Sequence, residues 1–362
     1  MDLLKMDKNF RTENADIDAY DWYDIQSELF SLHGVYFDEN EKIFTRMDKE
    51  SRESVSAHVG VLATYTAGGR IRFRTNTPYI AIYSTQPCAL NPNKGTLVNY
   101  CGFSYYANGV FCGATCPNPK GIYIDGQREF SYDGVIHVRY DIVKTEKIYD
   151  AEIYFPLYNG VNSIKIGIKK GSMLEKAKPY TYERPVVFYG SSITHGGCAS
   201  RPGTDYVNKI SRMLDCDIMN FGFTGNAKGE ENMARYMANI KASVYVLDYD
   251  YNAPSVEHLE KTHEPFYKKL REKNPDTPVV FISSPNPRYR IDGAKRFETI
   301  KRTYENAVKN GEKVALIDGT TFFGENDLGD CTVDGVHPSD LGFDKMTKVI
   351  APVIEKFLIA KK

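Results

Sequence analysis

The stretch that decides the fold is Val186-Val-Phe-Tyr189, which runs into Gly190-Ser-Ser-Ile-Thr-His-Gly-Gly197. An apolar run of this kind, bounded by a small-residue turn, is typical of a strand buried on both faces of a parallel sheet. Similar runs recur downstream, at Cys216–Phe221, Val244–Asp248, Val279–Ser283 and Val314–Asp318. Helical patterns separate or follow these runs, at Asp205–Leu214, Glu230–Ile240, Val256–Lys273, Lys295–Asn310 and Asp340–Ala360. Strands that alternate with helices predict a three-layer, flavodoxin-like α/β domain.

Upstream of residue 180 the sequence has a different pattern. Short runs of alternating polarity, separated by turn residues, lie at Arg70–Thr75, Tyr79–Tyr83, Gly121–Asp125, Gly134–Tyr140, Asp150–Phe155 and Ser163–Ile168. They predict an all-β sandwich or jelly roll, with no helix of normal length. Two prolines in the stretch 176–185 stop the elements of either half from running through. We therefore expect an N-terminal β-sandwich domain over residues 1–178 and an α/β domain over residues 179–362.

Composition excludes several classes of function. The 362 residues include 46 Lys and Arg against 47 Asp and Glu, so no basic excess exists to neutralise a nucleic-acid backbone. The longest apolar runs are far shorter than the roughly 20 residues of a membrane span. Met1–Lys8 has no basic segment followed by an apolar one, which predicts a cytoplasmic location unless a leader has been removed.

Cysteine and histidine spacing gives no sign of a metal site. The seven cysteines are an odd number in a long chain, so free thiols are expected. Cys112 and Cys116 are four apart but lack a second pair at zinc-finger spacing. His258 and His263 are five apart on a predicted helix, one residue more than two ligands on one face require. No metal is predicted.

Candidate chemistry lies in the loops that follow the predicted parallel strands, where ligands bind in open α/β sheets. Ser192 sits in the turn after the first strand, and Asp334 and His337 lie three apart just before the last helix. A hydroxyl needs a positioned base to act as a nucleophile, and imidazole titrates near neutral pH. The alternative is helix capping, by Ser191, Ser192 and Thr194 in the first turn and by Asp334 or His337 in the last loop. Capping explains one residue of the Asp–His pair but not both.

Two further loops can supply hydrogen-bond donors to an oxyanion. Asn220-Phe-Gly-Phe-Thr-Gly-Asn226 follows the second strand, and its glycines allow close approach of a ligand to the backbone. Asp248-Tyr-Asp-Tyr-Asn252 ends the third strand, and Asn252 offers a side-chain amide. Glycine turns and asparagine caps are the structural alternatives.

The order of these residues resembles the four blocks of the SGNH (GDSL-type) hydrolase superfamily. The resemblance implies that Ser192 is the nucleophile, with its own amide in the oxyanion hole beside Gly225 and Asn252. It implies Asp334 and His337 as acid and base, and it requires no cofactor. The chain departs from the family pattern at Ser191, where aspartate is usual, and in the third block, which is not Gly-x-Asn-Asp.

The first half resembles the β-sandwich that precedes the catalytic domain in two-domain SGNH esterases. The resemblance lies in Tyr154-Phe-Pro-Leu-Tyr-Asn-Gly-Val161 and Gly102-Phe-Ser-Tyr-Tyr-Ala-Asn-Gly109, although Ser104 departs from the usual Gly-x-Asp-Leu-Tyr. It implies an accessory domain of the carbohydrate-binding type. We expect a serine esterase that removes short acyl groups, chiefly acetyl, from a carbohydrate.

The alternatives are an acylhydrolase or acyltransferase that acts on a non-sugar ester, and a non-catalytic glycan-binding protein. The expected partner is an oligosaccharide or small-molecule ester, with no nucleic acid and no membrane; homo-oligomer formation is left open.

Several other side chains keep two interpretations. His195 either lines the substrate pocket or is a capping or solvated histidine. Arg201 either holds a polar substrate or forms a structural ion pair. Tyr105 and Tyr106, with Phe111 nearby, either form a stacking surface for sugar or pack within the strands.

Overall fold

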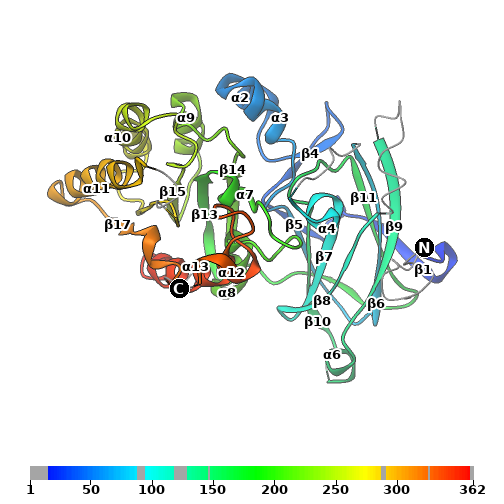
Figure 1. The fold of residues 1–362 in the computed structure, drawn as a ribbon. Helices are drawn as coiled ribbons and strands as arrows, with labels where there is room; N and C mark the ends of the chain where they lie inside the picture. The colour runs from blue at the N-terminus through cyan, green and yellow to red at the C-terminus, as the bar shows by residue number, and fades with distance from the viewer. Residues whose placement is uncertain are drawn as a thin grey trace.

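The computed structural model describes residues 15–87, 94–117, 129–145, 147–286, 291–324 and 327–358. Two bodies lie side by side, an antiparallel β-sandwich and a parallel sheet with helices on both faces (Figure 1). The predicted fold class is therefore confirmed. Every helix in the described ranges is too short or too polar to cross a bilayer.

The parallel sheet has the strand order β14-β13-β15-β16-β17, the 2-1-3-4-5 order of flavodoxin-like folds. Its strands are β13 (Tyr182–Gly190), β14 (Cys216–Gly222), β15 (Val244–Asp248), β16 (Val279–Ile282) and β17 (Val314–Ile317). Each of the apolar runs after residue 180 is thus a strand, and none is offset from its predicted position by more than a few residues. Because the strands are parallel, the loops after β13, β14 and β15 meet at one edge of the sheet.

Alternating side chains of the strands form two apolar layers. On β13, Val187 and Tyr189 join one core cluster, and Val186 and Phe188 join the other. The first layer is covered by α9 (Glu231–Ala238), α10 (Val256–Lys273) and α11 (Gly293–Lys309). The second is covered by α8 (Tyr206–Leu214) and α13 (Asp340–Glu355). Burial on both faces explains why these strands are continuously apolar.

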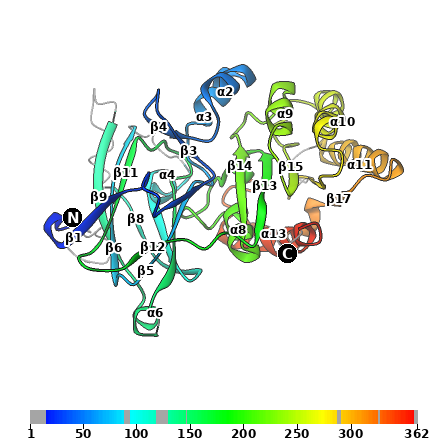
Figure 2. The ribbon, with the colours of Figure 1, turned by 180° about the vertical axis from the view of Figure 1, so that it is seen from behind.

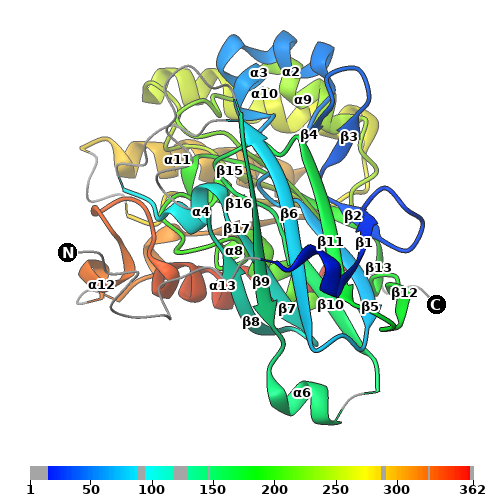
Figure 3. The same ribbon diagram turned by 90° about the vertical axis from the view of Figure 1, so that its right-hand side faces the viewer.

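The N-terminal domain packs two antiparallel sheets around a separate core. One sheet has the order β1-β11-β6-β9, and Figure 3 looks onto it. Its strands are β1 (Tyr20–Asp24), β6 (Tyr79–Pro87), β9 (Glu129–His137) and β11 (Ser163–Lys169). The other sheet, ordered β12-β5-β10-β7-β8 with β2 beside β5, has strands β2 (Ser31–His33), β5 (Arg70–Thr75), β7 (Phe103–Ala107), β8 (Val110–Thr115), β10 (Tyr149–Tyr154) and β12 (Leu174–Lys176). A small hairpin pairs β3 (Tyr36–Asp38) with β4 (Ile43–Thr45). The predicted run Gly121–Asp125 lies outside the described residues.

Short helices interrupt the β domain, none longer than seven residues among those described. They are α2 (Lys49–Val55), α3 (Ala57–Leu62), α4 (Leu97–Cys101) and α6 (Tyr140–Thr145). The side chain of Asp48 caps α2, and that of Ser56 caps α3. Val59 of α3 packs into the core cluster shared with β13 and β15, so this segment of the first half contributes to the core of the α/β domain.

The outer edge of the parallel sheet faces the N-terminal domain, because β14 is the strand nearest to the sandwich (Figure 2). Alternate carbonyls along this edge accept hydrogen bonds from two buried arginines. Arg70 Nη1 donates to Ile218 O (3.3 Å), and Arg46 Nη1 donates to Asn220 O (2.8 Å) and Gly222 O (2.9 Å). The two guanidinium groups therefore take the place of a further strand at an edge that would otherwise be unpaired.

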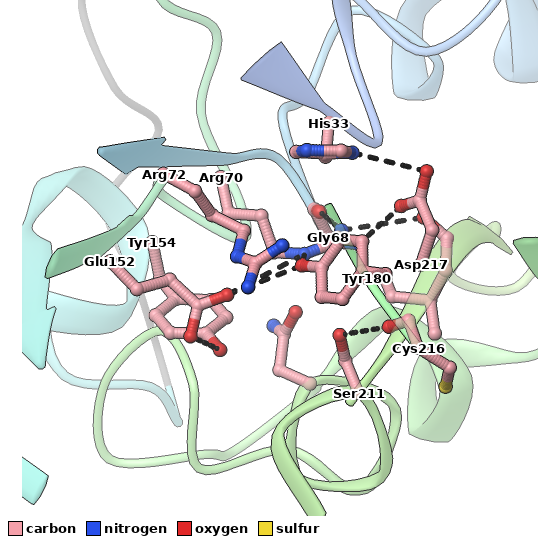
Figure 4. A network of polar contacts seen from close by, with 12 residues as sticks. His33, Gly68, Arg70, Arg72, Glu152, Tyr154, Tyr180, Ser211, Cys216 and Asp217 are labelled. Atoms are coloured by element: carbon pink, nitrogen blue, oxygen red, sulfur yellow. Dashed lines mark hydrogen bonds and ion pairs between the residues drawn. The ribbon is translucent and has the colours of Figure 1, made fainter. Parts of the chain in front are cut away.

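Arg70 is the centre of a polar network at the start of β14, which Figure 4 shows. Its guanidinium is ion-paired with Asp217, and its Nε donates to Tyr180 OH (2.7 Å). His33 Nδ1 lies 3.1 Å from Asp217 Oδ2, and Glu152 Oε1 lies 3.8 Å from Arg70 Nε. Burial alone would raise the pKa of Asp217, but Arg70 and His33 lower it to about 2. Asp217 is thus a charged anchor between the two domains.

Candidate active site

The turn that carries the candidate nucleophile Ser192, residues 190–197 (the nucleophile turn), begins where β13 ends. Ser191 caps α7 (Ser192–His195) by accepting a hydrogen bond from the amide of Ile193 (3.2 Å). Gly190 must be glycine, since a β carbon there would lie 1.9 Å from Thr194 Oγ1 and 2.5 Å from Asp248 O. The tight packing places Ser192 at the carboxyl edge of the sheet, with 8% of its surface exposed.

Ser192, His337 and Asp334 form a continuous hydrogen-bonded chain. Ser192 Oγ lies 2.8 Å from His337 Nε2, and His337 Nδ1 lies 2.9 Å from Asp334 Oδ2. The capping alternative for Asp334 and His337 does not hold, because Ser339 is the N-cap of α13. The chain has the geometry in which an imidazole can take a proton from a hydroxyl while a carboxylate fixes its tautomer.

Asp334 also organises its own loop. Its Oδ1 accepts hydrogen bonds from the amides of Val336 (3.1 Å) and His337 (2.8 Å). Burial acts to raise the pKa of Asp334, but the His337 amide, Lys94 and the His337 ring together hold it well below its usual range. Asp334 is therefore ionised at neutral pH and can stabilise a protonated imidazole.

Lys94 is a contact that sequence reasoning missed. Its Nζ lies 2.7 Å from Asp334 Oδ2, the same oxygen that faces His337 Nδ1. The lysine side chain is 60% exposed and comes from the N-terminal domain. A separation of 240 residues leaves no local pattern from which this contact could be found.

The loop that carries the candidate oxyanion donor Gly225, residues 223–227 (the oxyanion loop), follows β14. Gly225 has φ of +69°, and a β carbon there would meet nothing within 4 Å, so its requirement is conformational. Asn252 lies against this loop, where its Oδ1 accepts a hydrogen bond from the amide of Ala227 (3.3 Å). Within the described part of the chain, Asn252 Nδ2 donates to no protein group, so its N–H groups are available to a ligand. The structure thus brings Asn252 to the loop that carries Gly225.

His195 lies in the domain junction, and not at a surface that a substrate could reach. It is fully buried; its Nε2 donates to Leu157 O (2.7 Å) and its Nδ1 lies 3.1 Å from Thr224 Oγ1. Burial, assisted by Arg46, lowers the pKa of His195 well below its usual range, so the ring is neutral. The expected pocket-lining position of His195 is therefore corrected to an interdomain one.

Arg201 has structural partners. Its guanidinium stacks 3.8 Å from the ring centroid of Phe111, and its Nη1 lies 3.9 Å from Asp340 Oδ2. Tyr105 is buried in the core of the β domain and Tyr106 is buried against Arg212 of the α/β domain, so they do not form the open stacking surface considered from the sequence. Arg201 thus links the domains, and its remaining exposed surface is the only part that a substrate could contact.

Asp248 holds the nucleophile turn in place through hydrogen bonds from two hydroxyl groups. Its Oδ2 accepts hydrogen bonds from Thr194 Oγ1 (3.1 Å) and Tyr206 OH (3.0 Å). Burial, together with the neighbouring Asp250, raises the pKa of Asp248 well above its usual range. A buried carboxyl group with two hydroxyl partners fixes the turn without an ion pair.

Comparison with known families assigns each of the two domains to a family. Residues 183–355 match the GDSL-like lipase/acylhydrolase family, and residues 20–174 match the family that describes the N-terminus of SGNH hydrolase-type esterases. The chain belongs to the SGNH (GDSL-type) hydrolase superfamily, as a two-domain esterase with an N-terminal β-sandwich. It is a carboxylic ester hydrolase.

Solved structures share both domains. A Bacteroides ovatus protein described as a GDSL-like lipase is 28% identical, with a TM-score of 0.80 over 95% of this chain and 100% of its own. The salicylyl-acyltransferase SsfX3 of a tetracycline biosynthetic pathway is 19% identical, with a TM-score of 0.71 over 91% and 95%. A family two carbohydrate esterase from Clostridium thermocellum is 12% identical, with a TM-score of 0.59 over 90% and 98%. None of the curated proteins compared with the chain matches it.

Proposed function

We propose that the protein is a serine esterase that removes short acyl groups, chiefly acetyl, from the hydroxyl groups of oligosaccharides. The observation that carries the proposal is the hydrogen-bonded chain from Ser192 through His337 to Asp334, at the carboxyl edge of the sheet. A positioned base of this kind is what a serine hydroxyl needs to attack an ester at neutral pH.

The first half of the reaction forms an acyl-enzyme. His337 Nε2 takes the proton of Ser192 Oγ as this oxygen attacks the ester carbonyl carbon. The resulting oxyanion accepts hydrogen bonds from the amides of Ser192 and Gly225 and from the side chain of Asn252. Collapse of the tetrahedral intermediate breaks the bond to the sugar oxygen, which leaves with the proton from His337.

The second half releases the acid. His337 takes a proton from a water molecule, whose oxygen attacks the acyl carbon. The tetrahedral intermediate collapses, Ser192 Oγ regains its proton from His337, and the carboxylic acid departs. Asp334 stays ionised in both halves and stabilises the imidazolium each time it forms.

The substrate class is supported by aromatic rings beside the nucleophile. Tyr100 and Tyr158 of the N-terminal domain stack with centroids 5.2 Å apart, and both are partly exposed. Tyr158 OH lies 3.4 Å from the carbonyl oxygen of Ser192, so the pair borders the site of attack. Tyrosine rings with a polar tip suit the mixed polarity of a sugar ring. Because His195 covers the second face of Tyr158, a sugar would contact this pair at its exposed ring edges. The carbohydrate esterase of the same fold has been crystallised with cellohexaose, which supports the same substrate class.

Acetate release from acetylated oligosaccharides of xylan and mannan tests the proposal. Wild type should release acetate, and Ser192→Ala should lose the activity by several orders of magnitude. Ser243→Ala is the matched control, because this hydroxyl donates only to Arg184 O, away from the site. Transfer of the acyl group to an added alcohol in place of water would indicate an acyltransferase. Full activity in Ser192→Ala would overturn the assignment of the nucleophile.

A further inference from the structure

We infer that Tyr158, which the N-terminal domain supplies, is a positioning residue for ester hydrolysis: its hydroxyl ties the nucleophile turn to the oxyanion loop. The inference rests on the proposed function and deepens it. It gives the β-sandwich a part in catalysis as well as in substrate contact.

One oxygen atom contacts both loops. Tyr158 OH lies 2.9 Å from Thr224 Oγ1 and 3.4 Å from the carbonyl oxygen of Ser192. Thr224 immediately precedes Gly225, whose amide is assigned to the oxyanion hole. A shift of this hydroxyl would therefore change the position of the oxyanion donor relative to the nucleophile.

The space around the hydroxyl is closely packed. A β carbon at Gly197 would lie 2.8 Å from Tyr158 OH, 2.9 Å from Ser192 O and 3.2 Å from His337 Cδ2. These atoms of the turn, the tyrosine and the base thus surround one small volume. Only a glycine at residue 197 lets all three approach.

His195 holds the tyrosine ring and the loop together. The two rings stack with centroids 4.2 Å apart and an interplanar angle of 9°. The same imidazole donates to Leu157 O and contacts Thr224 Oγ1, so Thr224 is held by two neighbouring side chains. The neutral state of His195 avoids a second buried cation beside Arg46.

Removal of the hydroxyl alone should separate positioning from packing. In Tyr158→Phe the ring keeps its stacking partners, Tyr100 and His195, but the link between the loops is lost. Oxyanion donors act mainly in the transition state, so the loss should fall on kcat and not on KM.

Tyr149→Phe is the matched control. Tyr149 OH donates to Thr77 O (2.5 Å) and contacts Tyr105 OH (3.0 Å) within the core of the β-sandwich. This variant also removes a buried tyrosine hydroxyl from the N-terminal domain, but far from the nucleophile turn in the hydrogen-bond network. It reports any loss of activity that comes from destabilisation of the domain alone.

The experiment measures kcat, KM and the thermal midpoint of both variants with an aryl acetate. Tyr158→Phe should lower kcat by about 10- to 100-fold and leave KM within about twofold of wild type. Tyr149→Phe should lower the thermal midpoint without changing kcat. In a cycle with Thr224→Val, the double variant should lose less activity than the two single losses combined, since both substitutions remove the contact between Tyr158 OH and Thr224 Oγ1.

Failure of this inference can be distinguished from failure of the proposed function. An active enzyme in which Tyr158→Phe and Tyr149→Phe have equal kcat would overturn this inference alone. Strictly additive losses in the Thr224→Val cycle would also overturn it. Wild type that hydrolyses no ester would overturn the proposed function, and this inference with it.

Discussion

Each end of strand β14 meets the N-terminal domain through a buried arginine, and the two arginines have different kinds of partner. At the start of the strand, Arg70 is paired with Asp217 and lies close to Glu152 and Tyr180. At the end of the strand, Arg46 bonds to the carbonyls of Asn220, Gly222 and Leu62 and lies 4.9 Å from the centroid of Phe223.

The two arginines differ in how their buried positive charge is compensated. In the described ranges no carboxylate lies within ion-pair distance of Arg46, and burial lowers the pKa of this guanidinium to about 9. An uncompensated buried cation is costly. Arg46 lies at the end of β14 from which the oxyanion loop departs. A carboxylate paired with Arg46 at this position would repel the negative charge that develops on the oxyanion. We interpret the Arg70 end as the part that fixes the domains together and the Arg46 end as the part that serves the site.

The largest effect is expected from Arg70→Met. It leaves the partly buried Asp217 with only His33 beside it and removes the donors of the fully buried guanidinium, which should lower the free energy of unfolding by about 3–5 kcal/mol. Activity per folded molecule should remain near wild type, because the network lies at the end of β14 away from the oxyanion loop. Thermal unfolding and active-site titration measure the two quantities. A large fall in kcat with an unchanged thermal midpoint would reverse the assignment of the two ends.

Arg46→Met should lower stability less than Arg70→Met does and should also lower kcat. It removes an unpaired buried charge but takes the arginine donor away from the carbonyls of Asn220 and Gly222, so we expect a net loss of stability of about 1–3 kcal/mol. Release of Gly222 O should loosen the oxyanion loop and lower kcat by about tenfold. Arg52→Met serves as the control, because Arg52 is also buried in this domain but pairs with Glu41. Equal kcat values for the two variants would contradict the functional role of Arg46.

Asp217 gives the Arg70 end a pH dependence. Its folded-state pKa of about 2 lies below the unfolded value of about 4, so its contribution to stability is complete above pH 4. The contribution is lost as the pH falls from about 4 to about 2 and the carboxylate becomes protonated. Asp217→Asn should therefore destabilise the protein at pH 7 and converge with wild type near pH 2. Denaturant unfolding at several pH values measures this difference, and parallel curves would contradict it.

The smallest effect is expected from Lys94→Met. The ammonium group touches Asp334 Oδ2 but is mostly solvated, and exposed ion pairs contribute little. We expect a change in kcat/KM of about two- to threefold at low salt that disappears at high salt, because exposed charges are screened. A loss of a hundredfold or more, independent of salt, would show that Lys94 is an essential part of the site.

The sequence was sufficient for the parallel sheet and for the juxtaposition of Ser192 and His337. Strands buried on both faces are continuously apolar, and loops at the carboxyl ends of parallel strands converge. The short helices α2 and α3 were missed because seven residues or fewer do not establish a helical period.

The interdomain residues could not be predicted. Arg46, Lys94 and Tyr158 reach the α/β domain by tertiary contacts that leave no local pattern. His195 keeps two interpretations at the level of sequence, because its closeness to Ser192 along the chain does not show which way the side chain points. The structure directs it toward Leu157 of the other domain.

Identification of the acylated residue tests the account most directly. The protein is mixed with an aryl acetate, quenched in acid within the first turnover and digested, and the acylated peptide is located by mass spectrometry. We expect one acetyl group on Ser192, and no labelling within this time in Ser192→Ala or in His337→Ala, because His337 accepts the Ser192 proton during acylation. An acetyl group on another residue, turning over at the rate of product release, would contradict the account.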